Sequence, residues 1–95
     1  MAVELAYSWH RGDRDVEDLR VWVTARGRRL EMRVHGALDA RGSRHLAEIV
    51  GVAIRVAKEP RLVELDVRPV SAYCQESSDA LLGWERQGIR VRRRR

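Results

Sequence analysis

The sequence is poor in the residues that build disulfide frameworks and metal clusters, with a single cysteine, Cys74, among 95 residues. One thiol excludes both an intramolecular disulfide and a thiolate metal cluster. No apolar run approaches the roughly 18 residues that a membrane span needs. The first residues also lack the basic start and apolar core of a signal peptide. These absences predict a cytoplasmic protein that spans no membrane.

Excess charge of one sign is confined to the end of the chain. The formal net charge is +5, and five arginines lie in the last six residues, so the other 14 basic side chains balance the 14 acidic ones. A neutral body argues against a nucleic-acid-binding face built into the fold. The basic tail, residues 92–95, is expected to be solvated or to contact nucleic acid weakly and in a salt-dependent way.

Apolar and polar residues alternate in the first half of the chain, which is the period of half-buried strands. A chain of this length forms one domain. Residues 19–24 alternate, Gly27 supplies a turn, and residues 30–35 alternate again, so a β-hairpin is predicted. Residues 1–18 are expected to be an N-terminal extension or an edge strand.

Helical periodicity appears after a predicted loop, GALDARGS, at residues 36–43. Apolar residues between 46 and 57 recur on one helix face, and Pro60 is expected to close this helix. A dense apolar run at residues 61–67 predicts a strand covered on both faces. A loop then leads to a second helix at residues 77–87.

The chain ends in a short strand predicted at residues 89–91, so the order from residue 19 is β-β-α-β-α-β. Strand–helix–strand steps make right-handed parallel crossovers, and the hairpin adds an antiparallel edge. The sequence therefore predicts an α/β fold with a mixed sheet and its helices on one face.

Two stretches in this order resemble the STAS domain family, which includes the bacterial anti-sigma factor antagonists. They are GALDARGSRHLAEIV and RLVELDVRPVSAYCQESSDALL, and the resemblance covers about residues 19–91. It implies that the partner is an anti-sigma factor or another kinase-like protein. It also implies a partner-binding surface around the second helix and the loop before it. The residues expected there are Asp39, Ser71, Tyr73, Gln75, Glu76, Ser77, Ser78 and Trp84.

The sequence departs from the family at the turn that carries its regulatory serine. Aligned without gaps from Asp66, the family's turn Asp falls on Cys74 and its phosphorylatable Ser falls on Gln75. Ser77 and Ser78 follow just beyond; they either cap the helix or are phosphorylated there, where a helix N-terminus favours an anion. Glu76 could instead act as a fixed negative charge in place of a phosphate.

Residues typical of catalysis and metal binding are present but do not form a suggestive set. Asp39 and Asp66 are explained as cap or loop residues, Cys74 as a small packed residue, and the three histidines are too scattered for a metal site. Trp22 and Trp84 are candidates for partner contacts. The prediction is a non-enzymatic interaction module of the anti-sigma factor antagonist type, without cofactor. The alternative is a structural STAS-like subunit that self-assembles, as a homo-oligomer, or sits in a larger sensory complex without a serine phosphoswitch.

Overall fold

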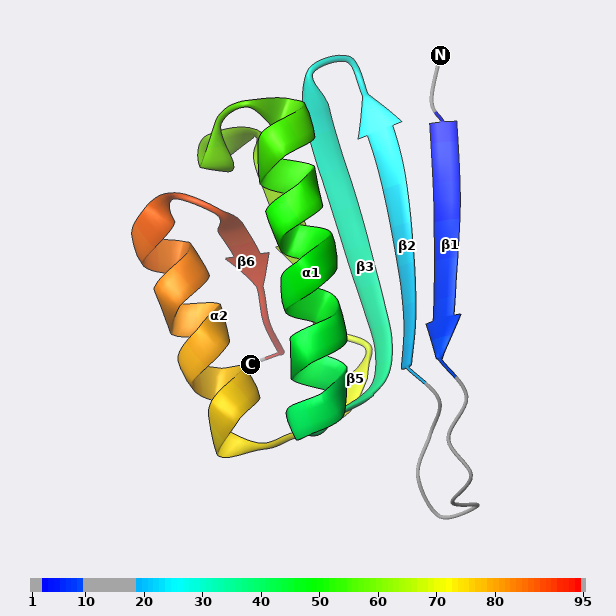
Figure 1. Ribbon diagram of the computed structural model, residues 1–95, viewed down its shortest axis with the longest axis vertical. Coiled ribbons are helices and arrows are strands. Elements are labelled where there is room, and N and C mark those ends of the chain that lie inside the picture. The colour runs from blue at the N-terminus through cyan, green and yellow to red at the C-terminus, as the bar shows by residue number, and fades with distance from the viewer. Residues whose placement is uncertain (1–2, 10–18, 95) are drawn as a thin grey trace.

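A computed structural model describes residues 3–9 and 19–94 of the chain. Two helices lie against one face of a six-stranded mixed sheet (Figure 1). The predicted α/β fold with its helices on one face is therefore confirmed. The elements in chain order are β1 (Val3–Trp9), β2 (Leu19–Arg26), β3 (Arg29–Leu38), α1 (Ala40–Ala57), the 3-10 turn η1 (Pro60–Leu62), β4 (Val63–Asp66), β5 (Val70–Tyr73), α2 (Gln75–Gln87) and β6 (Arg90–Arg92).

The sheet order is β1-β2-β3-β4-β6, with β5 pairing to the end of β3. β1 and β2, and β2 and β3, are antiparallel, whereas β3, β4 and β6 are parallel neighbours. Parallel neighbours require crossover connections, and α1 and α2 supply them. β1 thus forms one edge of the sheet, and α2 with β6 lies at the other (Figure 1).

The core lies between the sheet and the helices, and the alternation in the sequence decides which strand residues reach it. β2, β3 and β4 contribute every second residue, so the side chains between them line the opposite, uncovered face of the sheet. α1 contributes one apolar stripe. The most buried apolar side chains are Leu19, Val21, Met32, Val34, Leu38, Leu46, Val50, Val63, Leu65, Val67, Val70 and Leu81.

The predicted loop at residues 36–43 is wrong. Gly36 and Leu38 still belong to β3, Asp39 caps α1, and the helix already begins at Ala40. The register of the β3–β5 pairing shifts after Gly36, which has φ of +99°, and the extra residue at this irregularity is Ser71 on β5. Polar and small residues suggested a loop, but long-range strand pairing overrides that local preference.

The boundaries after α1 also differ from the sequence prediction. α1 ends at Ala57, ahead of Pro60 as predicted, with Lys58 in the left-handed conformation, and Pro60 itself starts η1. The strand predicted at residues 61–67 is shorter, because residues 60–62 form η1. The loop predicted before the second helix contains β5, and α2 starts at Gln75, two residues earlier than predicted. No helix among the described residues is both long and apolar enough to cross a bilayer.

Candidate functional site

The end of β3 and the start of α2 meet at one backbone carbonyl. The Leu38 oxygen accepts a hydrogen bond from the Cys74 N–H at 3.0 Å and another from the Ser77 hydroxyl at 3.0 Å. Asp39, the next residue, accepts from the Gly42 N–H at 2.7 Å and so caps α1. The two helix starts are therefore fixed to each other, although Leu38 and Ser77 are 39 positions apart.

Ser77 is part of the helix cap, but in a different position from the one predicted. Cys74 is the N-cap residue, and Ser77 lies three residues inside the helix, where its hydroxyl accepts from the Cys74 N–H at 3.0 Å. This reciprocal arrangement is a capping box. The prediction that a serine stands just before the helix is wrong because α2 begins earlier.

The two candidate phosphorylation sites differ in accessibility. Ser77 is 2% exposed and its hydroxyl is used in hydrogen bonds to Leu38 and to the Cys74 carbonyl. Ser78 is half-buried, and its backbone N–H donates to the Cys74 carbonyl at 3.1 Å. A kinase must reach the hydroxyl that it modifies, so Ser78 is the better placed of the two in this conformation.

Cys74 lies half-buried at the positive end of α2. Hydrogen bonding with the Ser77 side chain and with the Ser77 backbone N–H holds the pKa of the thiol below its ordinary value of 9.0, and Ser43 acts in the same direction. The Ser43 hydroxyl is buried and has no hydrogen-bond partner among the described residues. Ser43 lies in the first turn of α1, which Asp39 caps.

We expect the Cys74 thiol to be alkylated with a pH midpoint below that of an unperturbed cysteine, because the thiolate is stabilised by nearby donors. Iodoacetamide labelling of the folded protein from pH 6 to pH 10, followed by mass spectrometry, measures this midpoint. The Ser43→Ala variant should shift the midpoint upward, toward that of the protein in denaturant. Equal midpoints for the folded and denatured chains would contradict the assignment.

Half of the residues predicted to contact a partner are exposed around the start of α2. Ser71, Tyr73, Gln75 and Glu76 are exposed. Leu82, which the sequence did not single out, is 48% exposed and lies two turns along the same helix from Gln75. We call this set the α2 surface: Ser71, Tyr73, Gln75, Glu76, Asp79 and Leu82. Trp84 is half-buried and packs against the core, so it is not an exposed anchor.

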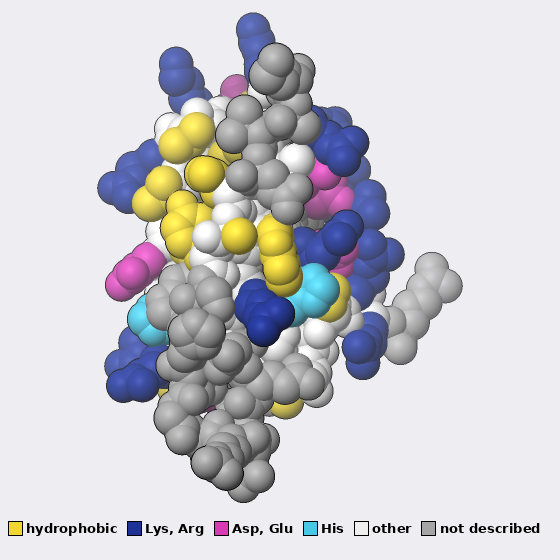
Figure 2. Space-filling view, turned by 90° about the vertical axis from the view of Figure 1, so that its right-hand side faces the viewer, with side chains coloured by type: hydrophobic (Ala, Val, Ile, Leu, Met, Phe, Trp, Pro, Cys, Tyr) yellow, Lys and Arg dark blue, Asp and Glu magenta, His cyan; other side chains and the backbone are white. Residues whose placement is uncertain are grey.

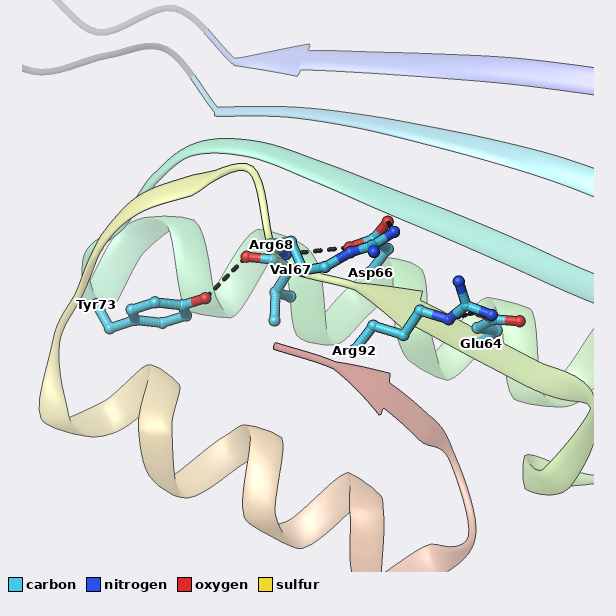
Figure 3. A network of polar contacts seen from close by, with 6 residues as sticks. All are labelled: Glu64, Asp66, Val67, Arg68, Tyr73 and Arg92. Carbon is cyan, nitrogen blue, oxygen red and sulfur yellow. Dashed lines mark hydrogen bonds and ion pairs between the residues drawn. The ribbon is translucent and has the colours of Figure 1, made fainter. Parts of the chain in front are cut away.

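Tyr73 has a fixed orientation on the α2 surface. Its hydroxyl donates to the Val67 carbonyl at 2.8 Å, which ties β5 back to the end of β4 (Figure 3). Burial raises the pKa of Tyr73, so the hydroxyl keeps its proton and remains a donor at neutral pH. Tyr73 is still 42% exposed as a residue, and an aromatic side chain held in one orientation is a favourable contact for a partner.

The uncovered face of the sheet carries a second candidate site, a shallow hollow of about 630 Å³. Its acidic side chains are paired with arginines. Asp66 accepts from Arg68 at 3.0 and 2.8 Å (Figure 3), Glu31 pairs with Arg26 at 3.2 Å, and Glu64 pairs with Arg92. Arg68 lowers the pKa of Asp66, so this carboxylate is ionised at neutral pH and is a poor proton donor.

Trp22 and His35 lie together in this hollow, at a ring-centroid distance of 4.6 Å and an interplanar angle of 74°. Burial and the neighbouring Arg33 lower the pKa of His35, so its imidazole is neutral at pH 7. The exposed Arg20 and Arg90 add to the positive charge of the same face. This face of the folded body is therefore positive, and Arg90 and Arg92 from the basic end of the chain contribute to it.

The described residues contain no group of three His, Cys, Asp or Glu side chains placed to hold a metal ion. Comparison with known proteins gives no relative: no protein-family model, no curated protein and no solved structure matches the chain. The membership of the STAS family that the motifs imply therefore remains a prediction.

Proposed function

We propose that this protein is a non-catalytic interaction module of the anti-sigma factor antagonist type, which binds a kinase-like partner protein through the α2 surface. The observation that carries the proposal is the shared Leu38 carbonyl. It joins the two motifs that resemble the STAS family and fixes the start of α2 relative to Asp39. A preformed surface loses little conformational entropy on binding, which favours recognition by shape complementarity.

The composition of the α2 surface fits a protein partner. Tyr73 and Leu82 supply exposed apolar area at 42% and 48%, and acidic and amide side chains surround them. Gln75 donates to Asp79 at 2.9 Å along the helix, so part of the polar rim is already ordered. An apolar centre with a polar rim is the usual anatomy of a protein–protein interface.

We also propose that the protein is cytoplasmic. A chain with a single thiol, which has no second cysteine for an internal disulfide, is consistent with this location.

Regulation in this proposal acts at Ser78 or through Glu76. A phosphate on Ser78 would add close to two negative charges beside the α2 surface. Glu76 already places one carboxylate in the first turn of α2, where it mimics part of that charge. Changing Glu76→Ser tests the second idea, since a fixed charge that matters must change partner affinity when it is removed.

The proposal is tested by affinity capture from the native cell with the wild-type protein and with Leu82→Arg. We expect the wild type to retain an anti-sigma factor or related kinase-like protein, and Leu82→Arg to retain at least tenfold less, because a buried hot-spot side chain contributes about 2 kcal/mol or more. Glu48→Arg is the control, since Glu48 is an exposed residue on α1. Equal capture by Leu82→Arg and Glu48→Arg would exclude the α2 surface.

A further inference from the structure

β1 is an open edge of the sheet. It pairs with β2 without interruption over seven residues, from Val3–Ala25 to Trp9–Leu19, and its other side has no strand partner among the described residues. Natural edge strands are usually protected by lysine, proline, a bulge or very short length. β1 has the sequence VELAYSW, with no lysine or proline, no bulge and one charged residue, Glu4. The backbone N–H and C=O groups on its outer side therefore offer a template for another strand.

An apolar surface accompanies this edge. Leu5 and Tyr7 pair in register with Val23 and Val21, so they lie on the same sheet face as the core. They remain 54% and 40% exposed because α1 and α2 cover the other half of the sheet (Figure 1). On α1, Val52 and Val56 are 47% and 64% exposed. Figure 2, viewed from the β1 edge, shows hydrophobic side chains gathered on this side of the molecule.

We propose that β1 pairs antiparallel with β1 of a second copy of this chain, with Ala6 opposite Ala6 across a twofold axis. This is the register in which all seven residues find a partner, since Ala6 is the middle residue of β1. Leu5 then stands opposite Tyr7 of the other copy on the apolar face, and aromatic–aliphatic cross-strand pairs are stabilising. Glu4 falls opposite Ser8, so no two like charges oppose each other.

The twofold axis is perpendicular to the sheet. The two sheets therefore join into one continuous sheet, and the helices of both copies lie on the same face of it. The joined edges satisfy backbone groups that are otherwise left to water. A single pair of seven-residue strands buries less than the roughly 1,200 Å² expected of a permanent interface. The dimer is therefore expected to be weak, and to be populated only at high protein concentration.

This interface is independent of the proposed function. α2 and β6 lie at the opposite edge of the sheet from β1 (Figure 1). A dimer formed through β1 leaves both α2 surfaces free and presents them together, so that a dimeric partner would be held at two points. When two binding sites are linked, the second binding event is intramolecular, and this raises the overall affinity for the partner.

The experiment is sedimentation velocity on the full chain with charge variants at the twofold axis. We expect the wild type to dimerise with increasing concentration, and Ala6→Lys and Ala6→Glu each to raise the dimer dissociation constant about fivefold or more, because like charges then face each other. An equimolar mixture of the two variants should recover dimerisation, since opposite charges then meet. Ala47→Lys, at an exposed position on α1, is the control and should behave as the wild type.

Three outcomes would overturn the inference. The first is a wild type that stays monomeric up to about 1 mM, the weak limit of specific association. The second is dimerisation that is unaffected by both Ala6 variants, which would place the contact on another face. The third is a mixture that fails to recover dimerisation although both variants retain the wild-type circular dichroism spectrum. None of these outcomes removes the difference in capture between the wild type and Leu82→Arg, so this inference and the proposed function fail separately.

Discussion

Ser77→Asp is expected to destabilise the domain by about 3–5 kcal/mol, because it buries a carboxylate against the Leu38 and Cys74 carbonyl oxygens. A domain of this size has a total stability of roughly 5–15 kcal/mol. The variant should therefore be largely unfolded or close to unfolding at 37 °C. Urea denaturation followed by circular dichroism measures the difference.

The matched variant is Ser78→Asp, one position further along the same helix. Ser78 is only half-buried and lies in the first turns of α2, where a negative charge is favoured by the helix dipole. We expect its stability to stay within about 1 kcal/mol of wild type. If Ser77→Asp were as stable as Ser78→Asp, the buried role of Ser77 would be wrong and Ser77 would again be a candidate for phosphorylation.

Gly36→Ala is expected to cost about 1–3 kcal/mol, the range for a side chain held in a rarely populated backbone conformation. Gly36 is buried with φ of +99°, at the point where the register of the β3–β5 pairing shifts. The strain can be relieved only by moving the end of β3, which carries Leu38 and Asp39. We therefore expect the loss of stability, measured in urea, to be accompanied by faster amide hydrogen exchange at Cys74.

Gly51→Ala is the control for Gly36→Ala. Gly51 lies in the middle of α1, and an added methyl group would meet no atom within 4 Å. Replacing glycine inside a helix by alanine is expected to raise the free energy of unfolding by about 0.5–1 kcal/mol. A destabilisation of similar size at both positions would show that the φ of Gly36 is not the cause.

The start of α2 shows how far local sequence reasoning reaches. The sequence placed polar residues at a helix start after Asp66, and the structure has a helix there. It could not assign the cap, because Cys74 is a poor N-cap by propensity and takes that position through the hydrogen bond from its N–H to Leu38. For the same reason Ser77 was expected at the surface and is buried. Leu82 was overlooked because helical spacing alone does not show which leucines remain exposed.

The sequence by itself determined the α/β fold, the hairpin from Leu19, the apolar face of α1 and the balance of charges, because these depend on periodicity and composition within short segments. Only the tertiary structure decided four features: the hydrogen bond between Leu38 and Ser77, the pairing of β5 with β3, the positive charge of the uncovered sheet face, and the position of β1 at an edge of the sheet. Each of these depends on contacts between residues far apart in the chain. Such contacts form when burial and strand pairing outweigh local preference.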